Sequence, residues 1–138
     1  MVHALREARR VLVPRGILID LRPININAPL EIVTPTSCFP AGMVDMGFNI
    51  ADDIAADNAF QDTLRAGSLT EIQADYFDFA YYWNTVVEMK ADMDDRWKDD
   101  AVISDSVLHQ AHLLFDQYRD QGRVRLRIRK KLIKYEKH

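Results

Sequence analysis

The sequence predicts an α+β fold derived from the α/β class: a mixed, largely antiparallel sheet of about four to five strands, with helices packed on it. Three observations lead to this prediction. The stretch "GILID" (16–20) is a short apolar run, which is typical of a buried strand. Residues 123–129 alternate between apolar residues and arginines, as in a strand with one buried and one solvent-exposed face. Several stretches between them have apolar residues at helical spacing.

Length and composition indicate one domain, residues 1–138. The chain is 48% hydrophobic and 28% charged, as in ordinary globular proteins, and its formal net charge of -3 gives no general attraction to nucleic acid or to an anionic membrane. A single cysteine, Cys38, cannot form an intrachain disulfide. The N-terminal residues are charged where a signal peptide would be apolar, and no segment is suited to span a bilayer. We therefore expect a cytoplasmic protein without membrane contact.

The opening stretch predicts a helix, a tight turn and a strand. Apolar residues recur at helical spacing up to Leu12, where Pro14 ends the helix, and Gly16 permits the turn. The following apolar run does not alternate, so we expect the strand to be covered on both faces. Helix, turn and buried strand make up half of an α/β crossover unit, which normally lies inside a sheet.

The middle of the chain predicts a hairpin, a helix and a long strand. Two short strand candidates around Pro35 suggest a loose hairpin or a loop excursion. A helix follows, with an apolar stripe that includes Ile54 and Ala59, and it ends at Gly67. In the long strand 69–83 the apolar residues change parity, which indicates a bulge near Asp75 or Tyr76, or a change from one-sided to two-sided burial.

Two further helices precede the final strand. Thr85 and Glu88 form a capping box, and a second helix begins near Ser104 or Ser106. The expected core combines residues of the sheet and of the helices in one layered system: Val11, Ile17, Ile19, Phe79, Trp83, Leu114, Phe115 and Leu126.

The stretch "ALREARRVLVPRGILIDLRP" resembles a segment of the class I S-adenosylmethionine-dependent methyltransferases, in which a helix ending in "RVL-Pro-x-Gly-Gly" leads into the fifth strand. Five residues match this pattern: Arg10, Val11, Leu12, Pro14 and Gly16. Arg15 stands where the family usually has its first glycine. The resemblance implies that residues 69–83 are the sixth strand of that fold and that the tail from Arg123 to Tyr135 is the antiparallel seventh.

The resemblance covers only the C-terminal half of such a fold. The family binds its cofactor with a glycine-rich loop after the first strand, and no Gly-x-Gly occurs in this chain. We therefore expect no cofactor-binding residue in this chain alone, and S-adenosylmethionine only if a partner supplies the missing half. Asp20 and Arg22, at the end of the corresponding fifth strand, are the candidates for the substrate pocket.

Other constellations favour structural roles. His109 and His112 are three apart on a predicted helix, yet no third metal ligand follows at a motif spacing, so no metal site is expected. The acidic run 92–100 lacks the glycine and terminal glutamate of a calcium loop.

Aromatic residues in 77–83 and the tail arginines could contact nucleic acid. Packing of the aromatic residues in the core, and a solvent-exposed face of the last strand for the arginines, explain them better. Cys38 has no pattern of histidine and acid around it and is not expected to be a nucleophile.

Three functional hypotheses follow. The first is a methyltransferase-like C-terminal domain without independent catalysis, which acts as an interaction or structural piece, as a homodimer or with an N-terminal methyltransferase half supplied in trans. The second is an active small-molecule methyltransferase subunit completed by such a partner. The third is an unrelated α+β module that binds a small molecule or nucleic acid.

Overall fold

The computed structural model describes residues 2–24 and 26–138, and the element bounds confirm the expected α+β class. Within these residues the α-helices are α1 (Val2–Val11), α2 (Ile50–Arg65), α3 (Val86–Arg96) and α4 (Asp105–Gln117), with a short 3-10 helix, η1 (Gly47–Asn49). The strands are β1 (Ile17–Pro23), β2 (Ala28–Val33), β3 (Cys38–Val44), β4 (Leu69–Trp83) and β5 (Arg123–Lys137). None of the helices in the described part of the chain has the length and apolar character of a membrane-spanning segment.

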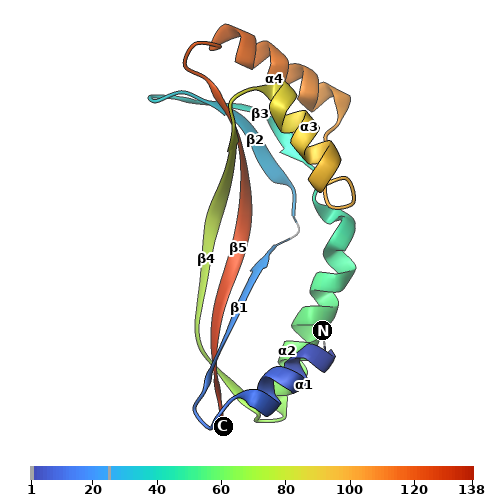
Figure 1. Ribbon diagram of the computed structural model, residues 1–138, viewed down its shortest axis with the longest axis vertical. Helices are drawn as coiled ribbons and strands as arrows, with labels where there is room; N and C mark the ends of the chain where they lie inside the picture. Colours follow the sequence, from blue (N-terminus) through green and yellow to red (C-terminus); the bar gives the residue numbers. More distant parts are fainter. Residues whose placement is uncertain (1, 25) are drawn as a thin grey trace. The chain divides into compact units, whose positions relative to one another are not determined.

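The last strand of the chain is the central strand of the sheet (Figure 1). Strand β5 pairs antiparallel with β1 through residues 130–136 and antiparallel with β2 through residues 123–126, and it also pairs with β4. Strands β2 and β3 form the expected hairpin, with a register shift between Leu30 and Glu31. Among the described residues the hairpin pairs with β5 and not with β1, so β5 is the one pairing partner of β1.

The chain divides into two compact units. The first consists of Met1–Ile24, Ile50–Phe77 and Lys130–His138, and it has its own small core. This core combines Leu5 of α1 with Phe60 of α2 and with Ile133 and Tyr135 of β5. The rings of Phe60 and Tyr135 stack with their centroids 4.8 Å apart, which joins α2 to the sheet.

The second unit consists of Asn25–Asn49 and Asp78–Arg129 and has the larger core. Helix α4 packs on β2 and β3, and α3 lies beside α4. This core contains Val124, Leu126 and Ile128 of β5 together with Leu30 and Ile32 of β2, Met89 of α3 and Phe115 of α4. The arginines of β5 occupy the opposite face, as the alternation predicts. The expectation of a single layered core is therefore replaced by two separate clusters, one in each unit.

The expectation that β1 is covered on both faces is wrong. Leu18 packs against the core of the first unit and Asp20 is buried, but Ile17, Ile19 and Leu21 are 41%, 53% and 55% exposed. The helices of this unit cover one face of β1, and a short apolar run cannot reveal how many faces are covered. Two more expected core positions also fail, since Val11 and Phe79 are exposed, and Ile54 of the predicted helical stripe is exposed as well. Trp83, Phe115 and Leu126 are buried as expected, and Leu114 is partly buried.

Local signals in the sequence place the helix ends and the first turn correctly. The Thr85 hydroxyl accepts a hydrogen bond from the Glu88 amide at 3.0 Å, and the Ser104 hydroxyl accepts one from the Val107 amide at 3.4 Å. In the turn before β1, Arg15 takes the left-handed conformation with φ of 62°. A side chain on Gly16 would lie 2.8 Å from the carbonyl oxygen of Val13, so this position requires glycine.

Candidate functional site

The two residues predicted for a substrate pocket contact each other on the buried face of β1. Asp20 and Arg22 are two positions apart and therefore lie on the same face of the strand. The Arg22 guanidinium donates from Nε and Nη2 to the two oxygens of Asp20, both at 2.7 Å. The side chains are only 6% and 13% exposed. Both carboxylate oxygens of Asp20 are thus engaged by its neighbour.

Two residues from other elements complete this polar cluster. Asp57 of α2 accepts a 2.8 Å hydrogen bond from Arg22, and it also accepts one from the ammonium group of Lys131 on β5. The Arg22 guanidinium lies over the Phe60 ring, 5.3 Å from its centroid. The cluster holds two carboxylates and two cations and is therefore neutral. We define these four residues, Asp20, Arg22, Asp57 and Lys131, as the β1 ion cluster.

The electrostatics of the β1 ion cluster favour the charged forms of Arg22 and Asp57. Burial alone would lower the pKa of Arg22, but the hydrogen bonds to Asp20 and Asp57 outweigh it and raise the pKa above its usual value. Burial would raise the pKa of Asp57, but hydrogen bonds from Lys131 and Arg22 hold it below its usual value. Burial, reinforced by the charge of Asp20, raises the pKa of the nearby Tyr135 to about 12. Within this cluster no carboxylate is left free to act as a base.

One atom of the β1 ion cluster is unsatisfied. Arg22 Nη1 is buried and has no hydrogen-bond partner within the described residues. The Nη1 group can donate to one further acceptor, but both carboxylates of the cluster are already hydrogen-bonded. The cluster is therefore suited to orient β1 against α2, and a substrate role for Asp20 and Arg22 stays a prediction.

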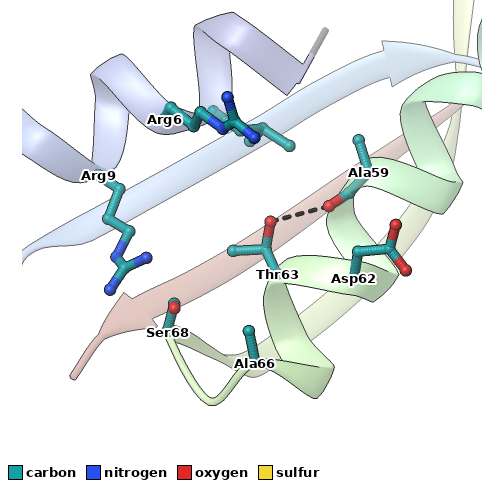
Figure 2. Close-up of a pocket in the computed structure, with 8 residues that line it drawn as sticks. Arg6, Arg9, Ala59, Asp62, Thr63, Ala66 and Ser68 are labelled. Carbon is teal, nitrogen blue, oxygen red and sulfur yellow. Dashed lines mark hydrogen bonds between the residues drawn. The ribbon is translucent and has the colours of Figure 1, made fainter.

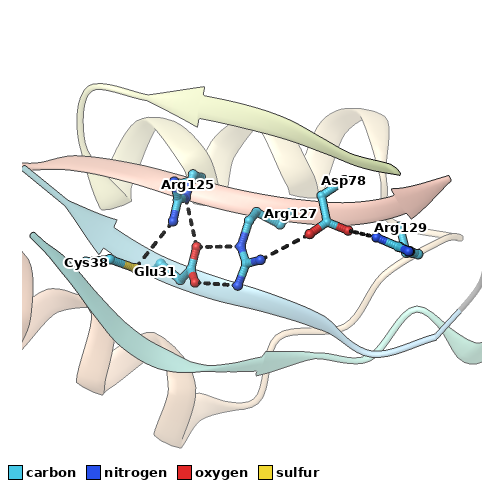
Figure 3. A network of polar contacts seen from close by, with 6 residues as sticks. All are labelled: Glu31, Cys38, Asp78, Arg125, Arg127 and Arg129. Atoms are coloured by element: carbon cyan, nitrogen blue, oxygen red, sulfur yellow. Dashed lines mark hydrogen bonds and ion pairs between the residues drawn. The ribbon is translucent and has the colours of Figure 1, made fainter. Parts of the chain in front are cut away.

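A second polar network lies on the open face of the second unit (Figure 3). Glu31 of β2 accepts hydrogen bonds from Arg125 Nε at 2.8 Å and from Arg127 Nη2 at 2.8 Å. Asp78 of β4 accepts hydrogen bonds from Arg127 Nη1 and Arg129 Nη1, each at 3.2 Å. We call this set the arginine ladder; it also includes Cys38, whose sulfur lies 3.3 Å from Arg125 Nη2.

The ladder fixes the ionisation of its members. Burial would raise the pKa of Glu31, but hydrogen bonds from Arg127 and Arg125 hold it below its usual value. Burial, with the carboxylate of Glu31 beside it, raises the pKa of the Cys38 thiol. A thiol whose pKa is raised is a poor nucleophile, which agrees with the expectation from the sequence.

The arginines of the ladder are largely paired with carboxylates of the protein itself. Two carboxylates bridge three arginines, and the fourth arginine, Arg123, lies over the Tyr82 ring at 5.1 Å from its centroid. A phosphate backbone would have to compete with Glu31 and Asp78 for these donors. This arrangement favours a structural role for the arginines over nucleic-acid binding.

The remaining candidates do not come together in a site. His109 is exposed and His112 is partly buried on α4, and no group of three possible metal ligands is found in the part of the chain that the structure describes. In the acidic run, Asp92 accepts hydrogen bonds from Trp83 Nε1 at 3.0 Å and from Arg96 Nε at 2.6 Å, and Asp94 pairs with Lys90. These contacts fix the end of a strand and the surface of α3.

The sequence does not single out Asp57 and Lys131 as members of a cluster, although it holds one signal for Lys131. Lys131 shares its parity with Ile133 and Tyr135, and this parity faces the core of the first unit. A lysine at a buried position of an apolar alternation requires an acidic partner. The partner lies 74 residues away, so its identity depends on how α2 packs against β5.

Comparisons with known proteins give no relative: no family model, no curated protein and no solved structure matches this chain.

Proposed function

We propose that this chain is the C-terminal part of a methyltransferase-like fold and that it acts as an interaction piece through the free edge of β1. The observation that carries the proposal is the position of the last strand. Strand β5 is antiparallel to β1 and pairs with it along residues 17–23, as the seventh strand covers one side of the fifth in the family that the sequence resembles. Strand β4, in the place of the sixth strand, also pairs with β5.

The turn before β1 gives independent support. Arg15 has φ of 62°, in the left-handed region that glycine adopts most easily. This is the position at which the family pattern has its first glycine. The backbone thus takes a conformation that favours glycine at the position where the pattern has one, although the residue differs.

The free edge of β1 is the feature suited to association. Pro23 lies opposite Lys130 of β5 and has no N–H group to donate. The ladder loses no hydrogen bond if the Pro23 nitrogen is directed away from β5, and we infer this orientation. Hydrogen-bonded residues alternate along an antiparallel ladder, so Ile17, Ile19 and Leu21 share this orientation. Their amide groups are directed to the free edge and their side chains form the exposed apolar face. Unpaired backbone groups beside apolar side chains form a template for another strand.

A partner strand at this edge would complete the sheet. In the isolated chain we propose that a second copy occupies it, since twofold dimers are the commonest closed assembly. In the complete fold we propose a cofactor-binding half at the same edge, in which case S-adenosylmethionine would be bound by that half. Titration calorimetry of the isolated chain with S-adenosylmethionine is expected to give no micromolar binding, and such binding would contradict the proposal.

Sedimentation equilibrium tests the association directly. The wild-type chain is expected to sediment at twice its 16.0 kDa mass at high micromolar concentration. Ile19→Lys places a charge on an exposed position of β1 and is expected to give a monomer. Leu18 is unsuitable for this test because it packs against the core of the first unit. Leu113→Lys, at a position of α4 that is 47% exposed, is the matched control and should remain dimeric. A monomeric wild type would refute the proposal.

A further inference from the structure

A cavity of about 250 Å³ lies in the first unit, against α1 and the end of α2 (Figure 2). Arg6 and Arg9 of α1 line it on one side, since residues three apart share a helix face. Ala59, Thr63 and Ala66 line it from α2 and the turn that follows. These side chains are small, and this leaves the space open.

The two arginines are not used by the protein itself. Neither Arg6 nor Arg9 has a hydrogen bond or an ion pair through its side chain with any residue in 2–24 or 26–138. Neighbouring arginines are occupied: Arg10 donates to Glu7 at 2.9 Å, and Arg65 donates to Asp62 at 3.2 Å. Arg6 and Arg9 therefore present free guanidinium groups at one cavity.

Helix capping does not account for these arginines either. Cations often stabilise the last carbonyl groups of a helix. At the end of α1 this role belongs to Lys137, whose ammonium group donates to the carbonyl oxygens of Arg9 at 2.8 Å and of Leu12 at 2.6 Å. The Arg9 guanidinium instead extends from the helix toward Ser68 (Figure 2).

The end of α2 places a hydroxyl group at the floor of the cavity. The amides of Gly67 and Ser68 donate to the carbonyl oxygens of Leu64 and Thr63, a helix-ending motif that requires the left-handed conformation seen at Gly67. This turn brings the buried residue Ser68 to the cavity. The Thr63 hydroxyl is committed to the Ala59 carbonyl oxygen at 2.8 Å. The Ser68 hydroxyl has no hydrogen bond with a described residue and can donate one to a ligand.

Asp62 adds a constraint on the ligand. Asp62 lines the same cavity, and among the described residues its carboxylate has one ion pair, an exposed one with Arg65. A ligand that is anionic throughout would meet this carboxylate, whereas a ligand that also carries hydroxyl groups could donate to it. Guanidinium groups match the oxygens of a phosphate or carboxylate with paired hydrogen bonds.

We propose that this cavity binds a small phosphomonoester that carries hydroxyl groups. Arg6, Arg9 and the Ser68 hydroxyl hold the phosphate, and Asp62 accepts a hydrogen bond from a ligand hydroxyl. The proposal does not depend on the function proposed above, because none of these residues lies on β1.

Titration calorimetry with glycerol 2-phosphate tests the site, with inorganic phosphate and glycerol as the two halves of the probe. We expect glycerol 2-phosphate to bind to one site per chain and more tightly than phosphate, with no binding of glycerol. The double variant Arg6→Gln/Arg9→Gln is expected to weaken binding by about tenfold or more. The matched control, Arg10→Gln, removes an arginine from the same helix that is already paired and should leave the affinity unchanged.

A second variant separates the cavity from general attraction by positive charge. Ala66 is exposed and lines the cavity, so Ala66→Leu fills the space without a change in charge or in the core. This variant should lose binding about as strongly as the double arginine variant, with an unchanged circular dichroism spectrum. The proposal is overturned if the wild-type chain does not bind glycerol 2-phosphate, if Arg10→Gln loses as much affinity as the double variant, or if Ala66→Leu binds like the wild type.

Discussion

Arg127 donates two hydrogen bonds to Glu31, from Nε to Oε2 at 3.0 Å and from Nη2 to Oε1 at 2.8 Å, across 96 residues of sequence. The Glu31 side chain is only 6% exposed, whereas Arg127 is 36% exposed. A buried carboxylate is stable only when its lone pairs are occupied, and Arg125 supplies the third donor. The arginine ladder therefore stabilises the pairing of β2 with β5 in the second unit.

Replacement of Glu31 with glutamine tests this role. The variant keeps the shape of the side chain but removes the charge, and it replaces one of the two oxygens that accept from Arg125 and Arg127 with an NH2 group that cannot accept. We expect a loss of about 2 kcal/mol in the free energy of unfolding, measured in urea. Asp78→Asn is the control, because Asp78 is 39% exposed and solvent screens its pairs, so its loss should stay below about 1 kcal/mol. Equal losses in the two variants would contradict the prediction.

The same residue predicts a dependence of stability on pH. The pKa of Glu31 is lower in the folded chain than in the unfolded chain, so ionised Glu31 favours folding. This contribution is complete above the unfolded pKa of about 4.3 and is lost as the pH falls through the lower folded pKa. Asp57, whose pKa is also lowered, contributes with the same sign. The urea concentration at the midpoint of unfolding of the wild-type chain should therefore decrease as the pH is lowered below about 4.

Glu31→Gln separates this contribution from the others. The variant should show a shallower fall of the urea midpoint over the same acidic range, because it has one fewer group to protonate. A variant with a slope equal to that of the wild type would show that Glu31 does not govern acid stability.

The arginine ladder also illustrates what the sequence could and could not predict. The alternation over 123–129 placed the arginines on the open face of β5, and the structure confirms it. The acidic partners could not be predicted, because Glu31 and Asp78 reach the arginines only after β2 and β4 have paired with β5. The covering of β1 was predicted wrongly for a related reason. An apolar run indicates burial, but which face is covered depends on where α1 and α2 pack.

Phe115 provides a test of the core in the second unit. It is 8% exposed on α4 and belongs to the cluster formed with β2 and β5. Phe115→Ala should lower the free energy of unfolding by about 3–5 kcal/mol, because the lost ring leaves a cavity. Leu113→Ala, two residues away and 47% exposed, should lower it by less than about 1 kcal/mol. A loss below about 1 kcal/mol for Phe115→Ala in urea unfolding would place the ring outside the core.

Gly42 permits the close packing of β3 with α4. Its φ is 150°, and a β-carbon built there would lie 2.6 Å from Cγ2 of Val107. We expect Gly42→Ala to lower the free energy of unfolding by about 2 kcal/mol, from steric overlap and an unfavourable backbone conformation. Val107→Ala in the Gly42→Ala background should recover part of this loss, as measured in a double-mutant cycle. Strictly additive losses would show that Val107 is not the obstacle.

A twofold dimer formed through the free edge of β1 would place each residue of the strand opposite a defined residue of the partner, and charged variants can test this register. An antiparallel pairing of two β1 strands about a twofold axis through Ile19 sets Ile17 opposite the partner's Leu21 and Ile19 opposite the partner's Ile19. All of these side chains then lie on one continuous apolar face. Ile19→Lys or Ile19→Glu places two like charges directly opposite each other, and each variant alone should be monomeric. An equimolar mixture of the two places Lys opposite Glu and should restore a dimer of mixed composition in sedimentation equilibrium. Two monomers in the mixture, or a dimer of either variant alone, would show that the twofold axis does not pass through Ile19.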